Sequence, residues 1–432
     1  MLPAGAADSD RLVDLGITSL EAFEIAVRSG LSIEVLLATS TTVSDIRATT
    51  KTTNSATMTK CEMQITKDLE LCPCAVLPGV HCQQKADRDT CVFVTGATGF
   101  LGSHLMKELL DCGTITRCFV LVRGDDGYER LLSRIHEAGS EDDKRVTAVR
   151  GDLSRPYFGL SASRFVELAQ KVTAIFHVGA RVDWLRPYED LRAANVDGTA
   201  TAISFALTAR AELHHISSGA VSAVTPIPSE LVHESGYTAS KTIAEALVTK
   251  AVDSHGLRAT IYRCGAVTTS TATTAVVNRH DYPSRLIESC LQLSMCVDSE
   301  AIFETIPVDL CAKIIVAVAS SKSERPMVLP ISNTASWTYC DLARELHSLD
   351  NTIRAVDACT FALAVSRSSC RLRPLSTALQ DPSWFANEDV NPCLETAAAA
   401  GMVSLAAPLG SEYLVRWIKA LGYSLPRGDT PG

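Results

Sequence analysis

The segment Cys91–Gly102, with the sequence CVFVTGATGFLG, constrains the fold of this chain more than any other. An apolar strand, Cys91–Thr95, runs directly into three glycines, and a helix is expected over Ser103–Leu110. A strand, a glycine-rich turn and a helix in this order can cradle the phosphates of a dinucleotide at the helix N-terminus. The turn residues that we expect to bind the dinucleotide are Gly96, Thr98, Gly99, Phe100, Leu101 and Gly102.

Strand and helix patterns alternate from Cys91 onward, which is typical of a parallel sheet covered by helices on both faces. The expected fold class is therefore α/β, a Rossmann-type doubly wound parallel sheet with right-handed crossovers. The expected strands are Cys91–Thr95, Arg117–Val122, Val146–Arg150, Ala174–His177, Leu213–Ser217 and Ala259–Arg263. The expected helices between them are 103–110, 127–138, 162–170, 188–208 and 237–251.

The alternation weakens after residue 265, so we divide the chain into four parts. Residues 1–50 form a short helical segment, and residues 51–90, rich in threonine and serine and then irregular, form a linker. Residues 91–265 form the dinucleotide-binding core. Residues 266–432 are expected to form a smaller, mostly helical C-terminal subdomain that covers the substrate.

Composition narrows the class of protein. The chain has 432 residues, 46% of them hydrophobic and 21% charged, and its net charge is −9. This charge argues against nucleic acid as the main partner. We find no signal-peptide pattern and no membrane-spanning run, and the 15 cysteines are scattered through apolar patterns. We therefore expect reduced thiols and a cytoplasmic enzyme with no membrane partner.

The end of the second strand indicates which dinucleotide is used. An acidic residue at this point binds the ribose hydroxyls of NAD, whereas an arginine accommodates the 2′-phosphate of NADP. The strand here ends in Arg123, which favours NADP, and Arg130 is a candidate for a second phosphate contact. The alternative is that Arg123 is only a solvated loop charge. Asp152 and Leu153 follow the third strand, where a carboxylate can reach the adenine, although Asp152 could equally cap the next turn.

Tyr237 and Lys241, in the sequence YTASK, lie one helical turn apart on the same face. A nearby lysine favours the phenolate, so we expect it to lower the pKa of the tyrosine, which donates a proton as hydride arrives. Ser218 ends an expected strand at the carboxyl edge of the sheet, and Ser217 faces the other way. Alone, a Tyr-x-x-x-Lys pair would be a surface helix pair. Its occurrence with the strand, the serine and the glycine turn indicates a catalytic Ser218, Tyr237 and Lys241.

Further candidates are weaker. Gly179 and Ala180, after the fourth strand, let the backbone approach the cofactor, and Asn195 is either a bridge to catalytic water or a structural amide. Cys72, Cys74, His81 and Cys82 lack regular zinc spacing, so we expect no metal. Ser19 precedes an expected helix and, without further context, would be an N-cap.

Taken together, these segments resemble a thioester reductase domain preceded by a truncated carrier domain. Such domains occur in nonribosomal peptide synthetases, some polyketide synthases, carboxylic acid reductases and aminoadipate reductases, within the extended short-chain dehydrogenase/reductase superfamily. The segments that carry the resemblance are 94–102, 121–123, 151–154, 177–182, 191–199, 216–218, 237–241, 262–265, 278–281, 307–309 and Trp337. One departure is Cys264, which stands where the family usually has proline.

The segment Asp14–Leu20 resembles the carrier motif whose serine bears 4′-phosphopantetheine, which would make Ser19 the attachment point and residues 1–50 a partial carrier domain. Only 18 residues precede Ser19, fewer than the first helix of a complete carrier domain normally needs.

The resemblance implies NADPH-dependent reduction of an acyl or peptidyl thioester, held on a carrier, to an aldehyde or onward to the alcohol. Ser218 and Tyr237 would stabilise the oxyanion, and Lys241 would bind the nicotinamide ribose. The implied partners are the acyl-loaded carrier and upstream synthetase modules. The alternatives are an extended reductase or epimerase acting on a free small molecule, and a cofactor-binding scaffold, although the intact Tyr237 and Lys241 argue against a scaffold.

Overall fold

The computed structural model describes residues 59–73, 90–221, 226–271, 277–321, 326–333, 337–376, 379, 385 and 409–424. The chain divides into two compact units, one formed by residues 1–66 with 228–233 and the other by residues 67–227 with 234–432. The first unit contains α10 (Pro228–Leu231). The sheet, the candidate catalytic residues and the C-terminal helices all belong to the second unit. Ser19 and the rest of segment 1–50 lie outside the described residues.

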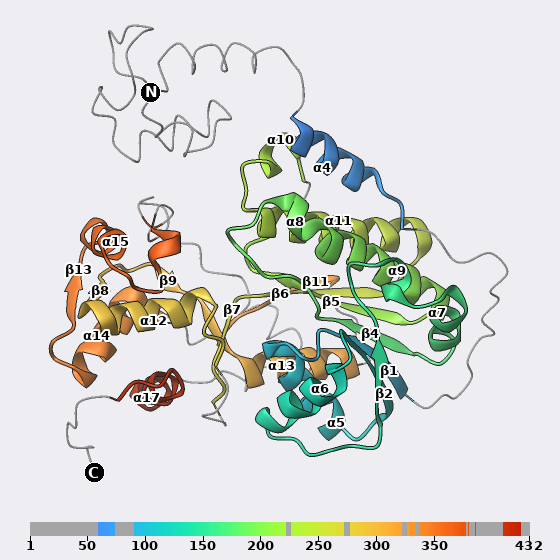
Figure 1. Ribbon diagram of the computed structural model, residues 1–432, viewed down its shortest axis with the longest axis horizontal. Helices are drawn as coiled ribbons and strands as arrows, with labels where there is room; N and C mark the ends of the chain where they lie inside the picture. The colour runs from blue at the N-terminus through green and yellow to red at the C-terminus, as the bar shows by residue number, and fades with distance from the viewer. Residues whose placement is uncertain are drawn as a thin grey trace, which may run out of the picture. The chain divides into compact units, whose positions relative to one another are not determined.

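Seven parallel strands form the central sheet, in the order β11-β6-β5-β4-β1-β2-β3 (Figure 1). The strands are β1 (Thr90–Thr95), β2 (Ile115–Val122), β3 (Val146–Arg150), β4 (Ala174–His177), β5 (Glu212–Ser218), β6 (Ala259–Cys264) and β11 (Val328–Ile331). The strand order reverses between β1 and β4, which is where doubly wound sheets bind their ligands. The expected α/β fold class is confirmed.

Helices cover both faces of this sheet (Figure 1). One face carries α5 (Phe100–Asp111), α6 (Gly127–Glu137) and α13 (Val308–Ser320), and the other carries α7 (Ala162–Ala169), α8 (Tyr188–Arg192), α9 (Gly198–Ala209) and α11 (Gly236–His255). Because side chains alternate along a strand, Val92 and Val94 join the core beneath α5, while Phe93 packs on Phe205 with ring centroids 4.7 Å apart. The central strand is therefore buried on both faces.

The helix expected over residues 188–208 is interrupted. A π-helical segment, η3 (Ala193–Asp197), separates α8 from α9. A π turn inserts one residue into the helical register, and such insertions are frequent at functional sites. Hydrophobic periodicity does not reveal a single inserted residue, so the sequence predicted one continuous helix. The insertion contains Asn195.

The C-terminal subdomain is built from helices and very short strands. Its helices are α12 (Tyr282–Leu293), α14 (Tyr339–Leu349), α15 (Ala358–Arg367) and α17 (Ser411–Ala420). Its strand pairs are β7 (Ala266–Thr268) with β10 (Thr305–Pro307), β8 (Met295–Val297) with β13 (Arg354–Val356), and β9 (Ile302–Phe303) with β12 (Trp337–Thr338). Phe361 and Trp417 are among the fully buried side chains of its core, which is separate from the core beneath α5.

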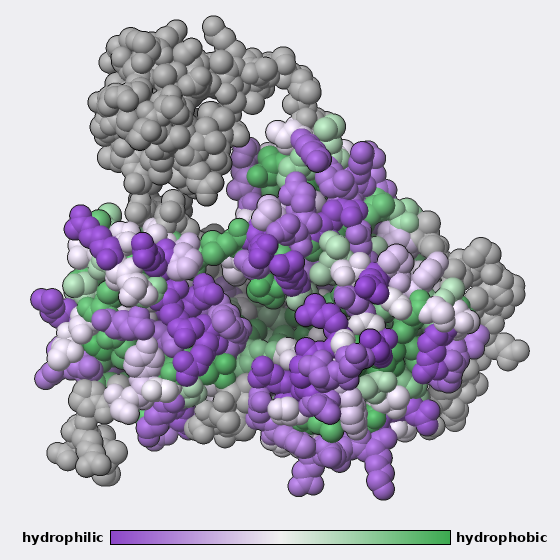
Figure 2. All heavy atoms as spheres, viewed as in Figure 1, coloured by the Kyte–Doolittle hydropathy of each residue, from purple (hydrophilic) through white to green (hydrophobic). Residues whose placement is uncertain are grey.

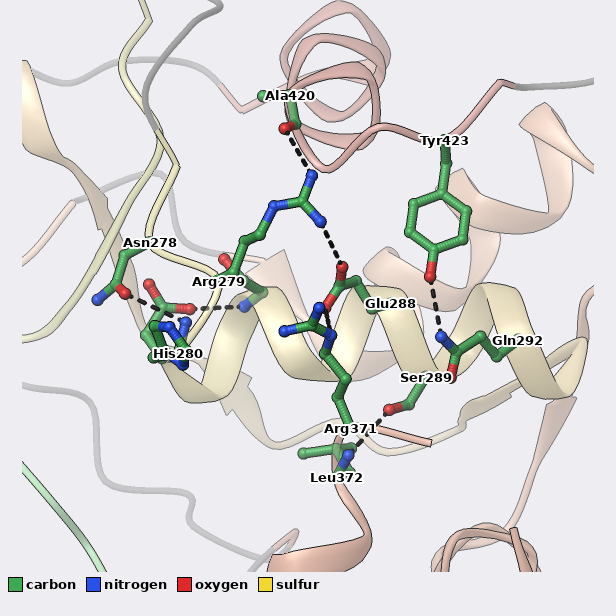
Figure 3. A network of polar contacts seen from close by, with 12 residues as sticks. Asn278, Arg279, His280, Glu288, Ser289, Gln292, Arg371, Leu372, Ala420 and Tyr423 are labelled. Carbon is green, nitrogen blue, oxygen red and sulfur yellow. Dashed lines mark hydrogen bonds and ion pairs between the residues drawn. The ribbon is translucent and has the colours of Figure 1, made fainter. Parts of the chain in front are cut away.

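A buried carboxylate joins distant segments of this subdomain (Figure 3). Glu288, on α12, forms ion pairs with Arg279 at 3.4 Å and Arg371 at 2.9 Å. Arg279 also donates a hydrogen bond of 3.3 Å to the carbonyl of Ala420, at the end of α17. Because the Glu288 side chain is buried, it would be costly to leave its charge without these partners, so Glu288 fixes α12 against both segments.

The interval 51–90, expected to be an irregular linker, contains the helix α4 (Lys60–Glu70), which corrects that part of the prediction. The Thr59 hydroxyl accepts a hydrogen bond of 3.0 Å from the Glu62 amide, a capping signal that the sequence analysis missed. Near the end of α4, the buried Asp68 accepts hydrogen bonds of 2.6 Å from the Tyr188 hydroxyl and from Nε and Nη2 of Arg192. This contact ties the end of α4 to α8.

Candidate active site

The turns after β1 and β4 meet where the strand order reverses. Gly96 has a φ of +74°, and a Cβ built on it would lie 2.5 Å from both Cα and N of Gly179. Only glycine combines this backbone conformation with so close an approach. Gly102 packs against the Gly96 carbonyl, where a Cβ would overlap it. The glycine turn is therefore held against β4 by backbone contact.

The turn presents the N-terminus of α5 to solvent. Gly99 is exposed and is the N-cap of α5, and it has no side chain to occupy the amides of the first turn. Unpaired amides at a helix N-terminus bind phosphate oxygens. Thr98, Phe100 and Leu101 are half-buried around this end. The residues present thus fit the pyrophosphate of a dinucleotide.

A chain of hydrogen bonds fixes the ends of β1 and β4. The Gly179 amide donates to Thr95 Oγ1 at 3.1 Å, and Thr95 Oγ1 lies 3.0 Å from His177 Nδ1. His177 Nε2 lies 3.2 Å from Thr199 Oγ1, which itself donates to the Asn195 carbonyl at 2.6 Å. Burial lowers the pKa of His177 to about 3, so the ring is neutral, with Nε2 as donor and Nδ1 as acceptor.

The loop after β3 packs beside the same turns. The Leu153 side chain is so close to Gly179 that a Cβ there would lie 2.5 Å from Leu153 Cδ1. Asp152 accepts hydrogen bonds from the Ser154 amide at 2.9 Å and hydroxyl at 2.7 Å, so it caps this turn. Burial raises the pKa of Asp152, but these bonds and the charge of Arg123 outweigh it and lower the pKa overall. Asp152 is therefore a carboxylate at neutral pH.

Arg123 directly follows β2 and has an exposed side chain, close enough to Asp152 to affect its pKa. Arg130, on α6, donates to the Arg123 carbonyl, and its Nε lies 3.2 Å from Asp126 Oδ2. Arg130 therefore supports the loop that carries Arg123. Its role as a second phosphate contact stays a prediction.

The three candidate catalytic residues lie together at the end of β5. Ser218 lies close enough to the Tyr237 hydroxyl to affect its pKa, and the Ala220 amide donates to Ser218 Oγ at 3.2 Å. Tyr237 and Lys241 lie on successive turns of α11 and are both buried. Lys241 Nζ donates a hydrogen bond of 2.6 Å to the Ile216 carbonyl on β5. The lysine thereby joins α11 to the strand that ends in Ser218.

Burial shifts the pKa values of this pair in opposite directions. It raises the pKa of Tyr237 to about 12, with a further increase from Cys264, while the nearby Ser218 hydroxyl opposes the shift. It lowers the pKa of Lys241 to about 8, against the charge of Glu245. The expectation that Lys241 lowers the pKa of Tyr237 is not met, because desolvation of the phenolate dominates. Tyr237 is a phenol at neutral pH and can donate its proton.

Asn195 is a structural amide. Its Oδ1 accepts from the Arg181 amide at 2.7 Å, and its Nδ2 donates to the Arg181 carbonyl at 3.0 Å and to Ser240 Oγ at 2.9 Å. Ser240 Oγ donates to the Tyr237 carbonyl at 2.8 Å. The π-helical insertion thus aims Asn195 at both the loop after β4 and the turn of α11 that carries Tyr237. Ala180, next to Arg181, is half-buried.

Two features of the site were not predicted. Glu245, one turn beyond Lys241, accepts a hydrogen bond from Ser217 and forms a buried ion pair of 2.8 Å with Arg263. This contact turns Ser217 away from Tyr237, as its place in the strand implies. The Trp184 ring also lies on the Tyr237 ring, with centroids 5.2 Å apart. The Lys-x-x-x-Glu spacing could have indicated Glu245, whereas Trp184 lies in a loop without periodicity.

Some predictions fall on other parts of the chain. Cys72 Sγ lies 3.3 Å from His255 Nε2, whereas Cys74, His81 and Cys82 lie outside the described residues. Within the described ranges, no helix combines the length and hydropathy needed to cross a membrane.

A doubly wound sheet, a glycine turn at its switch point and a Ser218, Tyr237 and Lys241 cluster define an oxidoreductase of the extended short-chain dehydrogenase/reductase type that uses a nicotinamide cofactor. Comparison with known families is consistent with this class. Residues 94–315 match the NAD-binding family described as "Male sterility protein", and the chain belongs to that family.

Two individual relatives show which kinds of protein the chain is similar to. The chain is 37% identical over 199 residues to the nonribosomal peptide synthetase asaC of Aspergillus flavus, covering 41% of this chain and 19% of the relative. It is 33% identical over 262 residues to the large subunit of L-2-aminoadipate reductase of Penicillium chrysogenum, covering 53% of this chain and 18% of that protein. The chain thus spans about a fifth of the length of these relatives.

Among solved structures, the chain is similar to the terminal R domain from the myxalamid PKS-NRPS biosynthetic pathway. The TM-score is 0.73 and the identity 25%, over 83% of this chain and 97% of that domain. The likeness therefore extends beyond the sheet to most of the second unit.

Proposed function

We propose that the protein reduces an acyl or peptidyl thioester, held on a phosphopantetheine carrier, with NADPH to an aldehyde or, in a second round, onward to the alcohol. The observation that carries the proposal is the Ser218, Tyr237 and Lys241 cluster beside the glycine turn. Two relatives point to the substrate class, because their names describe a peptide synthetase and a reductase of an amino acid.

The residues of the site suit this chemistry. Bound NADPH would supply the hydride that converts the planar thioester carbonyl into a tetrahedral centre. Ser218 and Tyr237 would donate hydrogen bonds to the developing oxyanion, and Tyr237 would then give up its proton to that oxygen. Lys241, held against β5, would supply a positive charge that stabilises the resulting phenolate. Loss of the thiol from the hemithioacetal gives the aldehyde.

Choice of cofactor rests on Arg123, which is exposed at the end of β2 where a 2′-phosphate would lie. We expect Arg123→Ala to raise the Kd for NADPH by about tenfold or more, the loss of a charge-assisted contact, and to leave the Kd for NADH unchanged. Titration of cofactor fluorescence measures both. If the variant loses the same affinity for NADPH and for NADH, Arg123 does not bind the 2′-phosphate.

The carrier would be the segment around Ser19, with 4′-phosphopantetheine attached to its hydroxyl and synthetase modules as further partners. We also propose that the reaction takes place in the cytosol, which cell fractionation can test. A phosphopantetheinyl transferase and coenzyme A should add one arm to the full chain, detected by mass spectrometry. Ser19→Ala should abolish the addition. If the arm is added both to wild type and to Ser19→Ala, or to neither, Ser19 is not the attachment point.

The test of the reaction is NADPH oxidation by the full chain with a panel of acyl-pantetheine thioesters. We expect aldehyde or alcohol as product, and we expect Tyr237→Phe to lower kcat by about 10²–10⁴-fold, the contribution of a general acid. Tyr423→Phe is the control, because this tyrosine contacts Gln292 in the C-terminal subdomain (Figure 3). If NADPH binds and no thioester is consumed, while a ketone or nucleotide sugar is, the protein acts on a free small molecule.

A further inference from the structure

The loop between β4 and α8 holds three large apolar side chains in solvent beside the candidate catalytic tyrosine. Val182 is 64% exposed, Trp184 43% and Leu185 59%. Single exposed apolar residues are common, but three within four positions form a patch, and such patches mark binding surfaces. The Trp184 ring covers Tyr237, whose own side chain is buried. The patch is therefore continuous with the site at which the thioester carbonyl would react.

This loop has a defined conformation. Asn195 hydrogen-bonds both the amide and the carbonyl of Arg181 at its start. At its end, a Cβ on Gly236 would lie 2.6 Å from the carbonyl carbon of Pro187, so the first turn of α11 packs directly on the loop. Between these ends, the Leu185 amide donates to Asp183 Oδ1 at 3.1 Å. The loop thus holds Trp184 over Tyr237 through contacts with η3 and α11.

Three charged residues near the patch are paired with one another. Arg186 forms ion pairs with Asp190 at 3.0 Å and with Asp183 at 3.5 Å. A substrate that lies on the patch therefore meets apolar side chains and no unpaired charge from these three residues. This arrangement favours an uncharged apolar chain over an acidic one, because a carboxylate placed beside these three residues would lose hydration without gaining an unpaired cation from them.

We propose that Trp184, with Val182 and Leu185, determines substrate specificity by forming an apolar wall for the acyl chain of the thioester. The inference rests on the proposed function. The carbonyl oxygen must lie within hydrogen-bonding distance of the Tyr237 hydroxyl, so the acyl carbons next to it reach the ring that covers Tyr237. Substrates of this wall are aliphatic or aromatic acyl groups. In Figure 2 the described part of the molecule is hollowed at its centre, with hydrophobic residues inside the hollow.

The experiment compares acetyl, hexanoyl, phenylacetyl and succinyl thioesters of pantetheine with the full chain. We expect wild type to prefer hexanoyl and phenylacetyl over acetyl, and to use succinyl least. Trp184→Ala should lower kcat/KM for the two long apolar groups by about tenfold or more, through KM, the scale of a lost apolar contact. It should leave acetyl within about twofold, and Trp184→Phe should restore most of the preference. Leu363→Ala, an exposed leucine on α15, is the control.

Each way in which the inference or the proposed function can fail gives a different result. If Trp184→Ala lowers kcat for all four substrates equally and moves the pH profile, Trp184 only supports Tyr237, and the inference is wrong. If KM rises equally for all four, the wall contacts the pantetheine arm, which also overturns it. If wild type binds NADPH but reduces none of the thioesters, the proposed function is wrong. If wild type reduces all four thioesters without preference, only the inference is wrong. Circular dichroism melting of each variant shows that it is folded.

Discussion

At the scale of single residues, we expect activity to depend on the charge of one buried lysine. Burial lowers the pKa of Lys241 to about 8, so its positive charge is lost just above neutral pH, whereas Tyr237, with a pKa of about 12, keeps its proton. We therefore predict that kcat/KM for reduction falls as the pH rises through about 8. Lys241→Arg should keep its charge and move this fall to higher pH. Initial rates between pH 6 and 10 measure the profile.

Two substitutions, Lys241→Arg and Lys241→Met, test whether Lys241 carries this pH dependence. Lys241→Met should be nearly inactive at every pH, because it has no charge to lose. If the fall near pH 8 persists unchanged in Lys241→Arg, another group carries the pH dependence. The folded-state pKa of Lys241 lies below its ordinary value of 10.5, so its burial opposes folding at neutral pH, and this cost is relieved as the pH rises from about 8 toward 10.5. Activity and stability should therefore change in opposite directions over this range.

Gly96 offers a second prediction at this scale. Gly96→Ala should lower stability by about 2–4 kcal/mol and abolish detectable NADPH binding, because the new Cβ combines a positive φ with a clash at Gly179. Gly256→Ala is a matched control: its φ is +63°, and nothing lies within 4 Å of its Cβ. Urea unfolding and cofactor titration compare them. Equal losses in the two variants would show that backbone strain alone, and not the contact between the turns, matters at Gly96.

At the scale of elements, α11 is fixed to the sheet by the buried pair of Glu245 and Arg263. Glu245→Gln should lower stability by about 2–4 kcal/mol, because it leaves a half-buried guanidinium without its countercharge. It should also lower the pKa of Lys241 further, since Glu245 raises it, so the fall in activity should begin at a lower pH. Thermal melting and the pH profile provide the two measurements.

Two controls separate the effects of charge and position. Glu167→Gln removes a carboxylate from an exposed pair with Arg164, and it should leave the melting temperature unchanged. The double variant Glu245→Leu with Arg263→Met should be more stable than Glu245→Gln, because no unpaired charge is buried. If Glu245→Gln destabilises the protein but leaves the pH profile in place, Glu245 holds α11 without affecting Lys241.

Sequence patterns predicted the regular strands and helices of the sheet core better than its short edge strand and the burial of its side chains. Six of the seven strands of the sheet were expected, because each is an apolar run and all but the first follow an expected helix. The missed strand, β11, is short and contains Pro330, which is tolerated because β11 lies at the edge of the sheet. The spacing of Tyr237 and Lys241 predicted a shared helix face. Spacing does not reveal depth, so the opposed effects of burial on their pKa values were not predictable.

At the scale of the whole molecule, the sheet and the C-terminal subdomain have separate cores, and only the packing of the sheet was predictable in detail. The sheet core arises from long apolar runs. The C-terminal core arises from helices joined by strands of two or three residues, such as β9 with β12, which are too short to show a period. Within this subdomain the Tyr413 hydroxyl joins α17 to the end of β7, because it lies 2.7 Å from Thr268 Oγ1 and donates to the Thr269 carbonyl at 2.9 Å.

Stability of the C-terminal subdomain should depend on pH through Asp281, the N-cap of α12. Burial raises its pKa to about 7, against hydrogen bonds from Ser284 and the charge of Arg285. Between pH 4 and 7 the folded state therefore binds more protons than the unfolded state, and the free energy of unfolding falls as the pH rises. Asp281→Asn keeps an N-cap acceptor without a charge. We predict that it matches wild type at pH 4 and is more stable by about 1–2 kcal/mol at pH 8.

Asp357 provides the matched control, because it is also an N-cap aspartate, on α15, but hydrogen bonds from Thr360 lower its pKa. A lowered pKa contributes stability above the ordinary pKa, which is lost on acidification, so Asp357→Asn should be less stable than wild type at pH 8 and closer to it at pH 3. Urea unfolding at pH 3, 4 and 8 tests both signs. If Asp281→Asn is also less stable at pH 8, the carboxylate at Asp281 is paired in solution, and the subdomain does not lose stability through this residue as the pH rises.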